Sequence, residues 1–407
     1  MSIGTMDSAG LRNAMVERLA ADHQGKGLTL RPEVEAAMRT VPRELFTPGI
    51  PVTEAYENTA VITKQLPSGE NISSVSAPFL IAEMLGQAAD ALDGLEGRHV
   101  LEIGSGGYNA ALLRELVGPS GSVLTVDIDP DVTDRAAVCL GTAGYDDVIV
   151  VCADAEYPIE PRRYDLIIVT VGAWDVPPAW RDQLTDDGVL VVPLRVFGTT
   201  RSWALRRSGD RLISHSRRLC GFVSMQGDGA SAIRHIDLAD GVHLRLDEGE
   251  QVDEASLSGI LDQPRAETWA GVSLPPRTAL PDLDTWLAVN LREQYVVLSA
   301  QDDAISAGLI APAWQYGTPA TLANGTFAYR SELRWADKRF DLGAYAHGPD
   351  AEAAARRMVE QMHTWVEAGC PEPTLDVLPA ATPDGDLPAG TVLDKRHSRL
   401  VLSFVLR

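Results

Sequence analysis

Short apolar runs alternate with segments of helical period between residues 99 and 194. The apolar runs predict strands, and their nearly continuous hydrophobicity is typical of parallel strands buried on both faces. The predicted strands are residues 99–103, 122–126, 148–152, 164–171 and 189–194. Apolar positions at helical spacing predict helices at residues 109–117, 131–143 and 177–184. This serial alternation indicates an α/β fold, a doubly wound parallel sheet with helices on both faces.

Other patterns lie on either side of this region. Upstream, amphipathic helices are predicted at residues 11–21 and 32–46, the second beginning on a proline. Downstream, two short apolar runs flank Ser208-Gly209-Asp210 and predict a hairpin, with strands at residues 203–207 and 212–216. A parallel sheet finished by a hairpin is more typical of methyltransferases than of dehydrogenases.

Beyond residue 226 the pattern is mixed. Strand-like runs occur at residues 242–246, 295–299, 340–346 and 400–406, and helices are predicted at 283–291 and 349–365. The last helix carries Ala354, Met358 and Met362 on one face. We therefore expect two domains, an α/β domain at residues 1–226 and an α+β domain at residues 227–407.

The stretch from residue 98 to residue 129 organises the α/β region. A strand ends just after Glu102, the turn Gly104-Ser105-Gly106-Gly107 follows, and the next strand closes on Asp127. Glycines let the backbone approach a ligand at the carboxyl end of a strand, where doubly wound sheets bind ligands. Asp127 lies 21 residues after Gly106, a spacing that suits an acid holding two ribose hydroxyls. A glycine turn without a ligand and a nicotinamide dinucleotide site are the alternatives.

Three serines precede a proline in residues 72–85, ISSVSAPFLIAEML, where a helix is predicted to begin. From spacing alone, the favoured interpretation is that Ser76 caps this helix. A serine hydroxyl beside a helix N-terminus also suits an anionic group, so a ligand role stays open.

Composition narrows the class of protein. The chain has 407 residues, 45% of them hydrophobic, and a mean hydropathy of −0.05, which describes a globular protein with an ample core. There is no run of 18 apolar residues and no signal-peptide pattern, so we expect a cytoplasmic protein without a membrane partner. A net charge of −22 argues against a nucleic-acid partner. Four scattered cysteines form no ligand pattern, and no metal is expected.

Several segments together resemble protein-L-isoaspartate (D-aspartate) O-methyltransferases. They are VPRELFTP from residue 41, Ser74-Val75-Ser76-Ala77-Pro78, VLEIGSGGYNAALL from residue 100, VDIDP from residue 126, and YDLIIVT-x6-PPAWRDQLTDDGVLVVP from residue 164. The resemblance covers about residues 28–225, and the order and spacing of the motifs make it specific. It implies a class I, Rossmann-like methyltransferase whose cofactor is S-adenosylmethionine.

The chain departs from the short repair enzymes of that family. Its glycine loop is one residue shorter than their usual GxGxGY, and residues 227–407 lie beyond their usual end. With CGFVSMQG from residue 220 and LDKRHSR from residue 393, the chain resembles longer actinobacterial methyltransferases of ribosomally made peptides, including the lanthipeptide-tailoring "FxLD system" type. That resemblance implies methylation of an aspartate in a precursor peptide, leading through succinimide to isoaspartate. Repair of isoaspartate in damaged proteins is the alternative.

The family resemblance also implies roles for single residues. Ser76 is expected to orient the acceptor carboxylate, and Asp127 to hold the ribose diol. The residues implied to contact S-adenosylmethionine are Ser74, Val75, Glu102, Gly104, Ser105, Gly106, Gly107, Asp127, Ile128, Asp154 and Ala155. A carboxylate is already ionised at pH 7, so the transfer needs no general base, and the site has to position and desolvate it.

The region after residue 226 is the candidate for peptide recognition, because the short repair enzymes lack it. Lys395-Arg396-His397 is a basic cluster that reads as a solvated face or, alternatively, as a contact for an acidic leader or the substrate carboxylate. His347 and His397 are expected to be structural. A cofactor-binding protein without catalysis is a further alternative, and the sequence does not indicate an oligomeric state.

Overall fold

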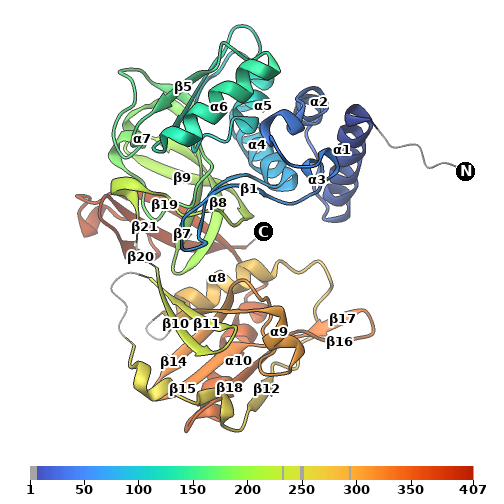
Figure 1. Ribbon diagram of the computed structural model, residues 1–407. Helices are drawn as coiled ribbons and strands as arrows, with labels where there is room; N and C mark the ends of the chain where they lie inside the picture. Colours follow the sequence, from blue (N-terminus) through green and yellow to red (C-terminus); the bar gives the residue numbers. More distant parts are fainter. Residues whose placement is uncertain (1–6, 232, 248–251, 293–294, 407) are drawn as a thin grey trace, which may run out of the picture.

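The computed structural model describes residues 7–231, 233–247, 252–292 and 295–406. Its largest element is a ten-stranded sheet in the order β20-β21-β19-β9-β8-β7-β6-β3-β4-β5 (Figure 1). Five parallel strands form one half of it, β3 (His99–Ile103), β4 (Ser122–Asp127), β5 (Ile149–Cys152), β6 (Tyr164–Val169) and β7 (Leu184–Val196). The hairpin β8 (Thr199–Ser208) and β9 (Arg211–Leu219) continues it antiparallel. The predicted α/β fold is confirmed.

Both faces of the central strands are buried, which explains their continuous apolar sequences. Successive residues of a strand point to opposite faces. Val100 and Val123 pack on the face with five helices, whereas Leu101 and Leu124 pack on the other face, with Trp180 of α7. The helices are α1 (Ser8–Gly25), α2 (Pro32–Thr40), α4 (Pro78–Leu92), α5 (Tyr108–Val117), α6 (Pro130–Ala143) and, on the second face, α7 (Pro178–Asp182).

The last strands of the chain join the same sheet. β19 (Glu372–Pro379) pairs antiparallel with β9, and β21 (Ser398–Val405) and β20 (Thr391–Asp394) complete that edge. We call this assembly, up to residue 219 together with residues 372–405, the α/β domain. Strands on the two sides of the boundary expected after residue 226 therefore belong to one sheet. The sequence did not indicate this, because the pairing of β19 with β9 leaves no local pattern.

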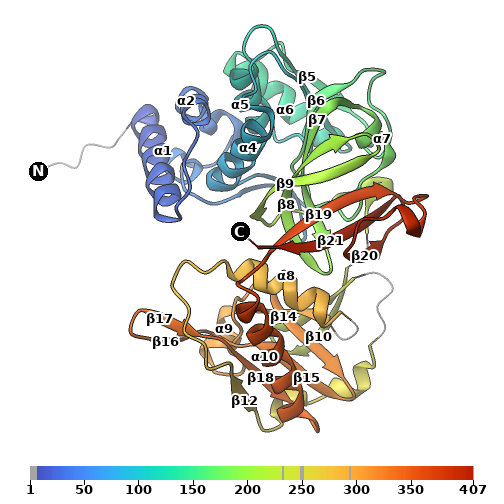
Figure 2. The same ribbon diagram turned by 180° about the vertical axis from the view of Figure 1, so that it is seen from behind.

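Residues 234–367 form a second unit, which we call the antiparallel domain (Figure 2). Its seven-stranded sheet has the order β10-β11-β13-β14-β15-β18-β12. The strands are β10 (Arg234–Ala239), β11 (Val242–Leu246), β12 (Ala266–Trp269), β13 (Tyr295–Ala300), β14 (Thr318–Ala323), β15 (Thr326–Arg330) and β18 (Gly343–His347). Helices α8 (Leu280–Asn290) and α10 (Ala351–Glu367) pack on one face, with Ala354, Met358 and Met362 buried as the period predicts. Helix α8 also contacts β8 and β19 and so lies between the two domains.

The remaining elements are short. They are η1 (Arg43–Phe46), α3 (Val52–Ala55), the hairpin β1 (Val61–Gln65) and β2 (Asn71–Val75), α9 (Asp302–Ser306), and the hairpin β16 (Arg334–Ala336) and β17 (Arg339–Asp341). The helix predicted over residues 32–46 ends at Thr40, because Pro42 cannot continue the hydrogen bonding of α2. Within the described residues, no helix has both the length and the apolar composition needed to cross a bilayer.

Candidate functional site

The site begins where the carboxyl ends of β3, β4 and β6 meet. Gly104 follows β3 with a φ of +95° and donates its N–H to the Val126 carbonyl oxygen at 2.8 Å. A Cβ at this position would lie 2.6 Å from Thr170 Oγ1, so only glycine fits. Thr170 Oγ1 also donates to the Gly104 carbonyl oxygen at 2.7 Å. The glycine turn is therefore held firmly against the edge of the sheet.

Asp127, the last residue of β4, contacts this turn. Its Oδ2 accepts a hydrogen bond from Ser105 N at 2.9 Å, and its Oδ1 accepts one from Asp129 N at 3.0 Å. Burial raises the pKa of Asp127, and the two backbone donors act against that effect. The turn and the acid that the sequence paired are thus in contact, and each carboxylate oxygen keeps acceptor capacity for a further donor.

A first cavity, which we call the Asp127 cavity, opens beside this acid. It brings together five of the predicted residues, namely Gly104, Asp127, Ile128, Asp154 and Ala155. Sequence reasoning missed the rest of its wall, formed by Ile72, Ile103, Val126, Ala153, Val171, Ser224, Met225 and Gln226. Residues 224–226 follow an irregular segment with neither helical nor strand period. The sequence singled them out only as part of the motif CGFVSMQG, which did not indicate where in the fold they lie.

A second cavity, which we call the Ser76 cavity, lies on the other side of the turn. It is lined by Ser74, Val75, Ser76, Ile81, Met84, Gly106, Tyr108, Asn109, Ile168, Thr170 and Phe222. A Cβ on Gly106 would stand 3.5 Å from the Ser74 carbonyl oxygen. The segment between β2 and α4 therefore rests directly on the glycine turn.

The interpretation of Ser76 as a helix cap is wrong. Helix α4 begins at Pro78 with Ala77 at the N-cap position, and Phe79 N donates instead to Asn58 Oδ1 at 3.0 Å. Among the described residues, none forms a hydrogen bond with the Ser76 hydroxyl. This hydroxyl is thus left to interact with a group inside the cavity.

Three predicted contact residues, Glu102, Ser105 and Gly107, lie behind the cavities instead of in their walls. Glu102 is 0% exposed, and its carboxyl group accepts from Asn109 Nδ2 at 2.7 Å and from Thr125 Oγ1 at 2.6 Å. Burial raises the pKa of Glu102 to about 7. Ser105 Oγ is buried without a hydrogen-bond partner among the described residues, and Gly107 precedes α5 with a φ of +80°. Glu102 thus lies beneath the turn, and Ser105 and Gly107 are part of the turn itself.

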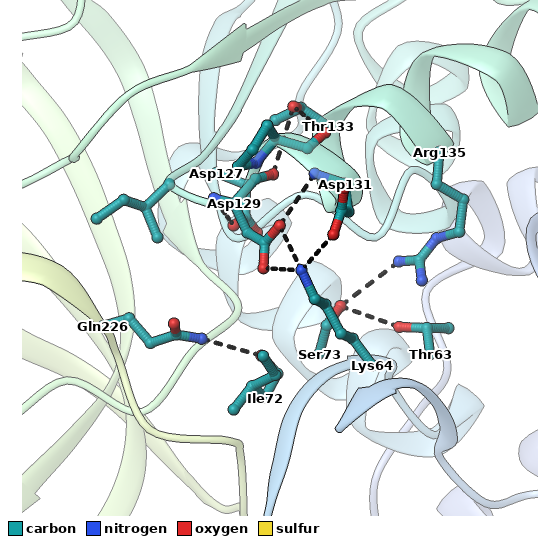
Figure 3. Close-up of polar contacts among 12 residues, drawn as sticks. Thr63, Lys64, Ile72, Ser73, Asp127, Asp129, Asp131, Thr133, Arg135 and Gln226 are labelled. Carbon is teal, nitrogen blue, oxygen red and sulfur yellow. Dashed lines mark hydrogen bonds and ion pairs between the residues drawn. The ribbon is translucent and has the colours of Figure 1, made fainter. Parts of the chain in front are cut away.

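The hairpin β1–β2 borders the Asp127 cavity and is joined to the loop after β4 by polar contacts (Figure 3). Lys64 Nζ lies 2.6 Å from Asp129 Oδ2 and 2.7 Å from Asp131 Oδ2, so an ion-pair cluster joins the hairpin to the loop after β4. Ile72 of β2 lines the cavity, and its carbonyl oxygen lies 3.5 Å from Gln226 Nε2 on the opposite wall. The hairpin is thereby attached to both sides of the cavity.

The basic cluster at residues 395–397 is folded against the α/β domain. Lys395 is 9% exposed, and its Nζ donates to the carbonyl oxygen of Arg195 at 2.5 Å and to that of Trp174. Burial lowers the pKa of Lys395 to about 7. His397 Nε2 lies 2.7 Å from Glu156 Oε1. The interpretations of this cluster as a solvated face or as a free contact for an acidic leader are therefore wrong for Lys395, which binds backbone oxygens inside the protein.

His347 of the antiparallel domain, which the sequence analysis also considered, is buried as well. His347 is 3% exposed, and its Nδ1 lies 3.0 Å from the Gln263 carbonyl oxygen. Burial lowers the pKa of His347, so the neutral ring is favoured. This agrees with a structural role for His347.

Comparison with known proteins identifies the family. The sequence model described as Protein-L-isoaspartate(D-aspartate) O-methyltransferase (PCMT) matches residues 13–229. Protein-L-isoaspartate O-methyltransferase 2 of Archaeoglobus fulgidus is 34% identical over 236 residues, which are 56% of this chain and 100% of the relative. Protein-L-isoaspartate O-methyltransferase of Methanopyrus kandleri is 36% identical over 222 residues, 53% of this chain and 92% of the relative.

A solved structure of a protein-L-isoaspartate O-methyltransferase is 21% identical, with a TM-score of 0.47, and covers 89% of this chain and 96% of its own. The family resemblance read from the motifs agrees with the names of these relatives, which are protein-L-isoaspartate O-methyltransferases. The chain therefore belongs to the protein-L-isoaspartate (D-aspartate) O-methyltransferase family of class I methyltransferases, and its cofactor is S-adenosylmethionine.

Proposed function

We propose that this chain transfers a methyl group from S-adenosylmethionine to the free carboxylate of an isoaspartyl residue in a protein or peptide. The observation that carries the proposal is that the two cavities flank the same glycine turn. Residues 74–76, which line the Ser76 cavity, rest on the glycine turn that borders the Asp127 cavity. A cofactor in one cavity and an acceptor in the other are therefore neighbours at this turn. The names of the curated relatives support isoaspartate as the acceptor.

The Asp127 cavity fits the nucleoside part of the cofactor. Two backbone donors fix the carboxylate of Asp127, which then accepts from the two ribose hydroxyls. Ile128 supplies an apolar surface for the adenine, and Asp154 with Ala155 lies at its edge. The backbone of Gly104 and its neighbours, with Ser74 and Val75 opposite, borders the methionine part. When bound, S-adenosylmethionine supplies an electrophilic methyl group on a positively charged sulfur.

Ser76 is assigned to orient the acceptor. Its free hydroxyl donates a hydrogen bond to one oxygen of the carboxylate and leaves the other oxygen to attack the methyl carbon. No side chain has to remove a proton, because the carboxylate is ionised at neutral pH. The apolar walls from Val75, Ile81 and Met84 exclude water, which favours a reaction that neutralises a negative and a positive charge.

Glu102, Ser105 and Gly107 are assigned as positioning residues, a change from their expected contact with the cofactor. The Glu102 carboxyl group already binds the side chains of Asn109 and Thr125, so it ties the end of β3 to α5 and to β4. Ser105 acts through its backbone N–H, which holds Asp127.

The test is mass spectrometry of an isoaspartyl peptide after incubation with S-adenosylmethionine. We expect a gain of one methyl group, and the normal aspartyl peptide should stay unmodified. Replacing Ser76 by alanine is expected to lower turnover by about tenfold or more, because one hydrogen bond to a charged group is lost, while cofactor binding persists. Ser73→Ala is the matched control, since Ser73 bonds to Thr63 and does not line the cavity. Equal turnover of the Ser76 and Ser73 variants would refute the assignment.

The second candidate function is methylation of an aspartate in a ribosomally synthesised, lanthipeptide-like precursor peptide. It is favoured by the antiparallel domain, since the Archaeoglobus relative is matched over its whole length by 56% of this chain. The amide nitrogen of the following residue then attacks the aspartyl ester, methanol leaves, and the resulting succinimide opens with water to isoaspartate. The same mass spectrometry separates the candidates. Methylation or loss of water on the aspartyl precursor, without methylation of isoaspartyl peptide, would select the second.

A further inference from the structure

A third cavity, of about 200 Å³, lies between the α/β domain and the antiparallel domain, and we call it the interdomain cavity. Its walls come from the end of the β7–β8 hairpin, from residues 219–225 and from the antiparallel domain. Figure 1 shows the end of this hairpin next to β10 and β11. Arg245 of β11 donates through Nη2 to the Gly198 carbonyl oxygen of the hairpin at 3.0 Å. Neither candidate function assigns a role to this cavity.

Three arginines, Arg195, Arg201 and Arg245, line the cavity in a chain whose net charge is −22. Arg195 pairs with Asp247 at 3.0 Å. Arg201 donates to two backbone carbonyl oxygens, at 2.9 Å and 3.0 Å. The acid in the wall, Asp284, is already paired with Arg330 at 2.8 Å. The local excess of positive charge attracts an anion, although the protein as a whole is negatively charged and repels anions.

Arg245 has unused hydrogen-bonding capacity. Its Nε is buried and has no hydrogen-bond partner among the residues that the structure describes. Burial lowers the pKa of Arg245, but a guanidinium stays protonated in proteins. A buried N–H without an acceptor is destabilising, and a carboxylate is the group that arginine binds best. A ligand carboxylate entering the cavity would satisfy this donor.

The interdomain cavity adjoins the reaction site. Phe222 lines both this cavity and the Ser76 cavity, and Ser224 and Met225 line both this cavity and the Asp127 cavity. An extended acceptor whose reactive carboxylate occupies the Ser76 cavity has the interdomain cavity as its neighbour on the other side of Phe222. The ligand that we infer for the arginines is therefore another part of the methyl acceptor.

Two aromatic side chains of the antiparallel domain complete the wall. Trp314 is 41% exposed and Tyr316 is 66% exposed, with ring centroids 5.6 Å apart. Exposed aromatic rings beside a charged pocket are typical of surfaces that bind peptides. A small free anion would gain nothing from these rings, whereas a peptide chain would pack on them.

We propose that the interdomain cavity binds an acidic side chain of the acceptor peptide, a few residues away from the carboxylate that is methylated. The proposal rests on the proposed function insofar as the acceptor is a peptide. It makes this enzyme selective for isoaspartyl sites with an aspartate or glutamate nearby, and it gives the antiparallel domain a role in choosing the substrate.

The test uses a set of fluorescently labelled isoaspartyl peptides in which one glutamate is moved from about two to six residues from the acceptor, with glutamine as the neutral partner at each place. Affinity is measured by fluorescence anisotropy and methylation by mass spectrometry, with the full chain. We expect the glutamate peptide to bind about tenfold more tightly than its glutamine partner at one or two of these places, with a gap that narrows as salt is added.

Arg245→Gln is expected to abolish this preference, so that the glutamate and glutamine peptides bind with equal affinity. Arg356→Gln is the matched control, because Arg356 is an exposed arginine of α10 that does not line the cavity. Thermal denaturation checks that each variant folds. Should Arg245→Gln not fold, Trp314→Ala, at an exposed position, is expected to weaken binding of both peptides severalfold.

The outcomes separate the two proposals. Equal affinity for glutamate and glutamine peptides at every position, in the wild-type protein, would overturn the role of the cavity even if isoaspartyl peptides are methylated. A preference for glutamate that Arg245→Gln abolishes would support the role of the cavity even if no isoaspartyl peptide is methylated, in which case the proposed function fails instead. Binding of free glutamate or phosphate in place of the peptide would likewise overturn the peptide as ligand.

Discussion

Replacing Glu102 by glutamine tests how the buried acid beneath the glycine turn affects the fold. The pKa of Glu102 is about 7 in the folded protein, above its ordinary value of 4.5, because burial disfavours the charged form. A raised carboxyl pKa means that the folded state binds the proton more tightly than the unfolded state does. Stability is therefore lost as pH rises from 4.5 through 7, and the loss is complete above pH 7. It amounts to roughly 3 kcal/mol at pH 8.

Glutamine removes this ionisation and keeps the shape of the side chain. Its carbonyl oxygen accepts from Thr125, and its amide donates to Asn109 once the Asn109 amide is turned over. We expect Glu102→Gln to exceed the wild type in free energy of unfolding by about 2–3 kcal/mol at pH 8 and by less than about 1 kcal/mol at pH 5.

The assay is urea unfolding followed by circular dichroism at pH 5, 6, 7 and 8. Other titrating groups are common to both proteins, so the difference between variant and wild type isolates Glu102. Glu115→Gln is the control, because Glu115 is an exposed acid on the neighbouring helix α5. A difference between Glu102→Gln and wild type that does not change with pH would show that Glu102 stays ionised, and the reasoning from burial would be refuted.

The other predictions concern the walls of the Asp127 cavity. Asp127→Ala is expected to weaken S-adenosylmethionine binding by about tenfold or more, since a charge-assisted acceptor for the ribose is lost; calorimetric titration measures this, and unchanged affinity would contradict the assignment. Gly104→Ala places a methyl group 2.6 Å from Thr170 Oγ1 at a φ of +95°, so we expect a loss of about 1–3 kcal/mol in thermal denaturation, and a stable variant would be inconsistent with the turn described here. Lys64→Ala removes the ion pair between the hairpin and Asp129, so we expect KM for the cofactor to rise severalfold at constant kcat. Lys338→Ala, remote from the cavity, is the control. An unchanged KM would argue against a role of the hairpin in holding the cofactor.

Local sequence patterns located the elements that position the site. The strand predicted at residues 99–103 is β3, and the strand predicted at residues 122–126 is β4, which also includes Asp127. Because parallel strands end at one edge of a sheet, the glycine turn after β3 and the acid at the end of β4 had to lie together. The predicted contact residues Glu102, Ser105 and Gly107 lie behind that edge. Periodicity places a residue on a helix, strand or turn, but it does not show which neighbouring residues its side chain contacts.

Other parts of the site arose from contacts between distant segments. Arg43 is fully buried and donates through Nε to the Ala55 carbonyl oxygen at 2.7 Å, a contact that no local pattern in the sequence indicates. The hairpin β1–β2 and residues 222–226 close the cavities without any regular period of their own. Their places depend on ion pairs and backbone contacts with loops far along the chain, which no local pattern records.

By itself, the sequence determined the alternation of strands and helices between residues 99 and 194, the parallel part of the sheet and the turn at its edge, because the spacing of apolar residues and glycines acts over a few neighbouring positions. Only the tertiary structure decided that β19–β21 return to the first sheet and that an arginine-lined cavity separates the two domains. Both features require residues that are far apart in the chain to meet. The free energy of such pairing depends on the whole folded arrangement and not on any single stretch of sequence.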